Sequence, residues 1–138
     1  MPTSADLLLD TSAAIALLHE AHPFHESVNE ACRGRVLGLA GHAMLETYSV
    51  LTRLPGAARV TPRRASQLID RAFPASSALP PRDALRAVPT LAAAGIAGGA
   101  VYDGLVALAA RAAGIPLLTC DQRALSTYAA VRIDVRML

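Results

Sequence analysis

Short apolar runs alternate with longer segments of helical character, and this alternation is the strongest constraint on the fold. Leu7–Leu9, Val36–Ala40 and Ile115–Thr119 are mostly apolar and have the length of buried strands. The segments between them carry the start and stop signals of helices. Strands separated by helices predict an α/β fold, in which right-handed crossovers cover both faces of a mostly parallel sheet.

Capping residues, prolines and glycines indicate where the helices begin and end. Thr61-Pro62 pairs an N-cap residue with a proline at the first helical position, and Gly114 follows a long apolar helix. The segment 130–135 alternates like an edge strand, and the loop at 73–81 has room for one short strand. The expected helices cover residues 11–19, 23–32, 41–54, 61–73, 82–94, 100–113 and 122–128.

Composition limits the class of protein. The 138 residues suit one domain, spanning 1–138, and 53% hydrophobic residues exclude intrinsic disorder. All 13 basic residues are arginine, which excludes chemistry that depends on lysine, such as P-loop phosphate binding and Schiff-base formation. An aromatic content of 4% argues against a nucleic-acid face built on stacked rings. The net charge of +2 does not by itself indicate nucleic-acid binding.

The sequence also indicates the compartment. Cys32 and Cys120 are too few for a disulfide scaffold, and the first residues lack the positive segment of a secretory signal. The longest uncharged stretch, residues 87–102, contains proline and glycines and is shorter than the ~20 residues that span a bilayer. We therefore expect a soluble, cytoplasmic protein.

Two aspartates stand where apolar strands end. Asp10 follows three leucines, and Asp121 follows the run that ends at Cys120. Ligands of open α/β sheets bind at the carboxyl edge of the strands, so both residues are candidates for a site there. Each aspartate also precedes a predicted helix, and the alternative interpretation is that each merely caps that helix.

Two further carboxylates lie within helices that are otherwise partly or wholly apolar. Glu46 has Ala43 and Val50 as helical neighbours, and it could equally be a solvated residue at the rim of an amphipathic helix. Asp103 interrupts an apolar stretch with no other charge between Arg86 and Arg111. An unpaired buried charge is costly, so Asp103 must be protonated, paired or bound to a cation. The alternative is an aspartate in the first helical turn that interacts with the helix dipole.

The four carboxylates together predict a metal site. If the strands that end at Asp10 and Asp121 are neighbours, two helices can bring Glu46 and Asp103 over the same edge of the sheet. Four adjacent carboxylates cannot all ionise without a counter-charge. Oxygen ligands favour Mg²⁺ or Mn²⁺, and such an ion suits phosphodiester hydrolysis by an activated water.

These residues carry a resemblance to a known family. The segments Leu8-Leu9-Asp10-Thr11-Ser12-Ala13, Leu45-Glu46-Thr47-Tyr48, Val101-Tyr102-Asp103 and Leu118-Thr119-Cys120-Asp121-Gln122-Arg123 occur in this order. With the chain length, this ordered set resembles PIN-domain ribonucleases, specifically the VapC-type toxins of bacterial toxin–antitoxin pairs. One departure is Ala124-Leu125, where many members carry an aromatic residue.

The resemblance implies more than the spacing does. It implies a three-layer α/β/α fold with a parallel sheet of about five strands, and Mg²⁺-dependent endonucleolytic cleavage of RNA. Asp10, Glu46, Asp103 and Asp121 would hold the metal directly or through water, with Thr11 or Thr119 assisting. A homodimer and a VapB-type antitoxin, whose tail enters the site, are also implied.

Several alternatives stay open at this stage. The fold could belong to a non-catalytic module that binds RNA or protein. A phosphatase or receiver-like domain is a third alternative, but Ser12 stands where the phosphatase needs a second aspartate, and the lysine of a receiver is missing. The arginines between residues 53 and 71 could line an RNA path or a solvated helical face. His19, His22 and His25 are interpreted as marking a helix corner, with a zinc site as the alternative. His42 lies one turn before Glu46, and Cys120 is interpreted as a core residue.

Overall fold

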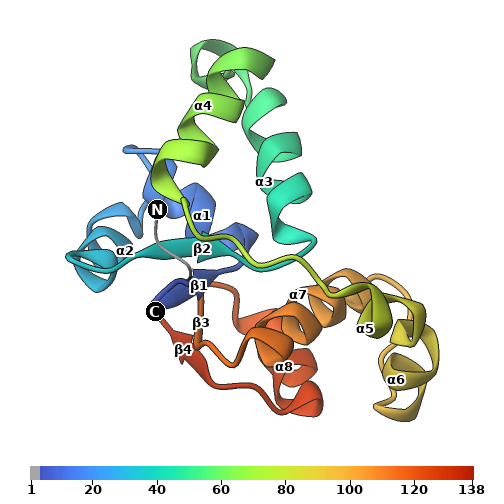
Figure 1. The fold of residues 1–138 in the computed structure, drawn as a ribbon. Coiled ribbons are helices and arrows are strands. Elements are labelled where there is room, and N and C mark those ends of the chain that lie inside the picture. The colour runs from blue at the N-terminus through green and yellow to red at the C-terminus, as the bar shows by residue number, and fades with distance from the viewer. Residues whose placement is uncertain (1–3) are drawn as a thin grey trace.

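The computed structural model describes residues 4–138 as an α/β fold with short strands and eight α-helices within that range (Figure 1). The strands are β1 (Leu7–Leu9), β2 (Leu37–Leu39), β3 (Leu117–Thr119) and β4 (Val135–Met137). The α-helices are α1 (Thr11–Leu18), α2 (His25–Cys32), α3 (Ala43–Thr52), α4 (Pro62–Ala72), α5 (Pro81–Leu85), α6 (Ala87–Ala93), α7 (Ala100–Ala113) and α8 (Leu125–Val131). Two 3₁₀ turns, η1 (Gly56–Ala58) and η2 (Gln122–Ala124), complete the chain.

The sheet is parallel, in the order β2-β1-β3-β4. The connection from β1 to β2 runs across the sheet in one direction, and the connections from β2 to β3 and from β3 to β4 run in the other. Right-handed crossovers therefore place α1 and α2 on one face, and α7 and α8 on the opposite face. The result is the predicted three-layer α/β/α arrangement (Figure 1), in which β1, β2 and β3 are buried and the edge strand β4 is partly exposed.

The pairing of β1 with β3 positions the site. Leu9 lies opposite Leu118, so the residues that follow these two strands emerge side by side at the carboxyl edge. The leucines of β1 and β3 are almost completely buried, because helices cover both faces of the two central strands. The condition under which the sequence analysis placed Asp10 and Asp121 at one edge of the sheet, that the two strands are neighbours, is therefore met.

Within residues 4–138 the sheet has four strands, not about five. The segment that could have held another strand runs beside β2, where Ala75 and Ser77 donate backbone hydrogen bonds to Leu37 and Leu39. However, the Leu39 amide donates to the Oγ of Ser76 rather than to a backbone carbonyl, and only an isolated bridge between Ala40 and Ser77 forms. The Ser76 side chain thus interrupts the ladder of backbone hydrogen bonds between this segment and β2. This close approach also explains Gly38, because a Cβ there would overlap the Ala75 carbonyl.

Two other predicted elements differ from the structure. The helix expected at 82–94 is broken at Arg86 into α5 and α6. Pro89 is the reason, since its ring would clash with the carbonyl four residues earlier in a continuous helix. The edge strand expected at 130–135 is wrong: α8 continues to Val131, Arg132 adopts a left-handed conformation, and β4 begins only at Val135.

Local signals elsewhere are confirmed. The Thr61 side chain accepts a hydrogen bond from the Arg64 amide at the start of α4, and Gly114 ends α7 in the left-handed conformation. None of the helices described between residues 4 and 138 has the length and apolar character needed to cross a membrane.

Candidate active site at the carboxyl edge of the sheet

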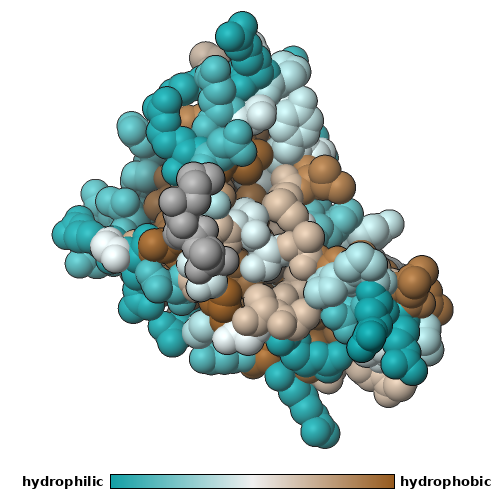
Figure 2. Space-filling model, in the orientation of Figure 1, coloured by the Kyte–Doolittle hydropathy of each residue, from teal (hydrophilic) through white to brown (hydrophobic). Residues whose placement is uncertain are grey.

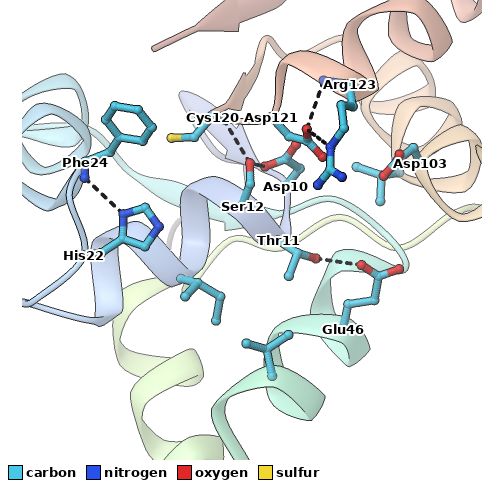
Figure 3. Close-up of a pocket in the computed structure, with 13 residues that line it drawn as sticks. Asp10, Thr11, Ser12, His22, Phe24, Glu46, Asp103, Cys120, Asp121 and Arg123 are labelled. Atoms are coloured by element: carbon cyan, nitrogen blue, oxygen red, sulfur yellow. Dashed lines mark hydrogen bonds and ion pairs between the residues drawn. The ribbon is translucent and has the colours of Figure 1, made fainter. Parts of the chain in front are cut away.

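All four candidate carboxylates line one pocket of about 450 Å³ (Figure 3). Asp10 follows β1 directly, and Asp121 lies two residues beyond the end of β3. Glu46 comes from α3, and Asp103 comes from the first turn of α7. The fold thus brings residues that are up to 111 positions apart in the sequence to one pocket.

Asp10 is the most enclosed of the four, with 4% of its surface exposed. Its Oδ1 accepts hydrogen bonds from the Ser12 hydroxyl (2.6 Å) and the Ala13 amide (3.0 Å), so Asp10 is also the N-cap of α1. Its Oδ2 accepts a 2.7 Å hydrogen bond from the hydroxyl of Tyr128 on α8. Asp10 therefore caps α1, as the alternative interpretation expected, and it also lines the pocket.

A hydroxyl network links the ends of β1 and β3. The Ser12 hydroxyl accepts a hydrogen bond from the Cys120 amide and lies 3.3 Å from the Thr119 hydroxyl. The Thr119 Oγ1 in turn accepts from the Asp121 amide. This network holds the two strand-end aspartates in a defined relation. Thr119 therefore supports the site through the backbone amide of Asp121, whereas Thr11 contacts Glu46.

Glu46 is held from two sides. The Thr11 hydroxyl donates to its Oε2 (3.1 Å), and the Nε2 of His42 lies 3.2 Å from its Oε1. The His42 ring also stacks on Tyr102, with 5.1 Å between the ring centroids. His42 therefore contacts the site through Glu46, and Thr11 fixes the orientation of the same carboxylate.

Asp103 has a perturbed titration. Burial raises its pKa to about 6 from an ordinary value of 3.8, and the negative charges of Asp10, Asp121 and Glu46 raise it further. Arg123 opposes this effect in part. Asp103 lies in the first turn of α7, as the helix-dipole interpretation expected, but its electrostatic environment is that of a carboxylate cluster.

Asp121 has a cationic neighbour. Its Oδ1 accepts a hydrogen bond from the Arg123 amide (3.0 Å) and lies 3.5 Å from the Nε of Arg123. This caps η2, as the alternative interpretation expected. The Arg123 side chain is 95% exposed, so the ion pair is weak and solvent can replace it.

The chemical nature of the four carboxylates suits a hard divalent cation, whereas the spacing between them does so less clearly. Four carboxylates with only Arg123 as a cationic lining residue form a site that attracts cations. Within residues 4–138, however, no three acidic, histidine or cysteine side chains lie close enough to hold one ion together. This spacing is compatible with Mg²⁺, which is usually bound through one or two carboxylates, waters and substrate phosphates rather than by a closed protein cage.

Ser12 and Tyr128 are site residues that the sequence analysis missed. Ser12 lies two residues after a strand-end aspartate. A hydroxyl at that position commonly bonds to the local backbone and carboxylate, so the spacing could have identified Ser12 from the sequence. Tyr128 is fully buried, and burial beside Asp10 raises the pKa of its hydroxyl well above the usual value, so it remains a hydrogen-bond donor. A buried tyrosine needs a partner, but the sequence does not identify that partner.

The remaining candidates have structural roles. Burial raises the pKa of the Cys120 thiol to about 11, which disfavours the thiolate needed for nucleophilic attack. His22 accepts a hydrogen bond from the Phe24 amide, and the ring of His25 bonds to the Ala16 carbonyl. These contacts confirm a helix corner at His22 and His25.

Comparison with known proteins agrees with this geometry. The PIN domain family model matches residues 7–130. Ribonuclease VapC27 of Mycobacterium tuberculosis is 44% identical over 129 residues, which cover 94% of each chain. Two solved structures share the fold. One is M. tuberculosis VapC20, described as a sarcin-ricin loop cleaving toxin, with a TM-score of 0.66, 20% identity and coverage of 94% and 98%. The other is VapBC2 of Rickettsia felis bound to a promoter DNA fragment, with a TM-score of 0.67, 10% identity and coverage of 96% and 98%.

The match to the family model covers most of the chain, and the identity to VapC27 extends over almost the full length of both proteins. The chain therefore belongs to the PIN-domain family and resembles the VapC-type ribonucleases within it.

Proposed function

We propose that this protein is a cytoplasmic, Mg²⁺-dependent endoribonuclease of the toxin–antitoxin type, with Mn²⁺ able to substitute. The observation that carries the proposal is the shared pocket of Asp10, Glu46, Asp103 and Asp121, in which three carboxylates contribute to raising the pKa of the fourth. VapC27 is named a ribonuclease, which supports the activity. Its 44% sequence identity to this chain over nearly the full length supports proposing the same activity here. We further propose that residues 1–138 form one PIN domain.

In this proposal the four carboxylates hold the cation directly or through water. A divalent cation supplies two effects to phosphodiester hydrolysis: it lowers the pKa of a coordinated water and stabilises negative charge on the phosphate oxygens. The chain's own hydrogen bonds preorganise the ligands. Ser12 and Tyr128 orient Asp10, and Thr11 and His42 orient Glu46.

Removal of divalent cations is expected to abolish cleavage. The purified protein should cut RNA in Mg²⁺, lose this activity in excess EDTA, and regain it when Mg²⁺ or Mn²⁺ is restored, because the carboxylates alone repel the phosphate. Gel analysis of a labelled RNA measures the products. RNA that is bound but never cut under any of these conditions would instead identify a non-catalytic binding module.

We also propose a homodimer and an antitoxin partner. Leu45 (68% exposed) lines an apolar cleft together with Met44, Leu79 and Leu105, and this surface suits a second copy of the chain. The exposed Tyr102 stacks on His42, which also lines the cleft. The name of the R. felis structure, VapBC2, describes a two-component assembly and supports the partner.

Light scattering tests both partners. The protein alone should have twice the 14.3 kDa mass of one chain. Co-expression with the product of the adjacent upstream reading frame should yield a heavier complex that no longer cuts RNA. A mass of one chain at all concentrations contradicts the dimer.

A further inference from the structure

The pocket itself is a poor binding site for RNA. A phosphodiester that approaches four carboxylates is repelled, and Arg123 is the only cation among the described lining residues to oppose that repulsion. Neutralisation by a metal removes the repulsion but adds little attraction for a long chain. The binding energy for RNA must therefore come from a surface next to the pocket.

Such a surface is present on the arm formed by α3, η1 and α4, residues 43–72. Figure 1 shows α3 and α4 as a pair of packed helices that project from the sheet, and Figure 2 shows hydrophilic residues over this end of the molecule. Residues 53–72 contain five arginines and one carboxylate, Asp70, so their formal charge is +4, and the rest of the chain carries −2 of the net +2. The five arginines are Arg53, Arg59, Arg63, Arg64 and Arg71.

These arginines are exposed and available to a ligand. Between residues 4 and 138, the ion pairs involve Arg33, His42 and Arg123, and none involves an arginine of the arm. Only Arg59 has a side-chain hydrogen bond, to the Leu54 carbonyl. Guanidinium groups bind phosphate oxygens in a bidentate manner, so unpaired arginines on a projecting arm suit a phosphate backbone.

The arm is continuous with the pocket. Glu46 and Val50 of α3 line the pocket, and Arg53 is the C-cap of α3, three residues after Val50. On α4, Arg64 and Arg71 are seven residues apart, on one strip beside the face that packs through Ala65. The helical rise separates them by about 10 Å. We propose that these arginines form a phosphate track, on which single-stranded RNA lies while its scissile bond enters the pocket.

This inference rests on the proposed ribonuclease function, but binding can be tested without cleavage. The double substitution Arg64→Gln/Arg71→Gln is introduced into the Asp10→Asn protein. The binding of this variant to a fluorescein-labelled single-stranded RNA of about 20 nucleotides is then measured by titration. The matched control is Arg82→Gln/Arg86→Gln, which removes two exposed arginines from α5 and its end and changes the net charge equally. Arg64→Lys/Arg71→Lys keeps the charge without the planar fork.

The arm variant should bind RNA about five- to twentyfold more weakly at low salt, and the slope of log K against log salt should fall by about 1.4, for two lost phosphate contacts. The control should stay within about twofold of its parent, and the lysine variant should recover much of the binding. In the chain with Asp10 restored, the arm variant should raise KM for long RNA while kcat is unchanged.

The outcomes separate the two proposals. Equal RNA binding by the arm variant and its control overturns the track, even if the wild-type protein cleaves RNA in Mg²⁺. Absence of cleavage with intact, arm-dependent binding overturns the ribonuclease function and leaves the track standing. If the arm variant loses affinity for a labelled polyglutamate peptide but not for RNA, the arm binds an acidic protein segment and the track is wrong.

Discussion

Asp10→Asn is expected to reduce RNA cleavage by about a thousandfold or more while leaving the protein folded, since removal of a preorganised electrostatic element costs roughly this much. Asparagine is as good an N-cap as aspartate, so α1 keeps its start at Thr11. The amide oxygen can still accept from Ser12 and Ala13, and the Tyr128 hydroxyl can accept from the amide nitrogen. The substitution therefore removes the charge that a cation needs and little else.

The matched control for this variant is Asp134→Asn, an exposed aspartate without a side-chain partner in the described contacts. It makes the same change of charge away from the pocket and should retain full cleavage. Initial rates on a labelled RNA, with circular dichroism to show that both variants fold, measure the effect. Cleavage by Asp10→Asn at a rate near that of Asp134→Asn would falsify the role of the pocket.

Asp103→Asn should also abolish cleavage, yet it should make the metal-free protein more stable near neutral pH. The raised pKa of about 6 means that the folded state holds the Asp103 proton more tightly than the unfolded chain, whose value is near 3.8. Stability therefore decreases as pH rises from about 4 to about 6, and the full penalty is present above that range. Asparagine cannot ionise and avoids this penalty.

The gain should be about 1–2 kcal/mol above pH 6, below the full equivalent of the pKa shift because solvent partly screens the half-buried group. It should vanish near pH 4, where the wild-type carboxyl is protonated in both states. Urea unfolding in EDTA at several pH values measures it. Added Mg²⁺ should stabilise the wild type more than the variant, and a variant that is less stable than the wild type at pH 8 contradicts the carboxylate cluster.

Sequence reasoning succeeded where a feature depends on neighbouring residues. The leucines of β1 and β3, the Thr61 cap and the Gly114 stop are local signals, and each predicted element is present. It failed where two local signals competed. Pro89 breaks the helix expected at 82–94, and the Ser76 side chain replaces the backbone partner that a fifth strand needed.

By itself, the sequence determined the class of the fold and the strand-end positions of Asp10 and Asp121, because hydrophobic runs and helix caps act over a few residues. Only the tertiary structure decided that Glu46 and Asp103 reach the same pocket, and that Tyr128 donates to an aspartate 118 residues away. Those contacts depend on how helices cross the sheet edge and on the register of β1 with β3. Packing between distant segments determines both, and no local pattern in the sequence records it.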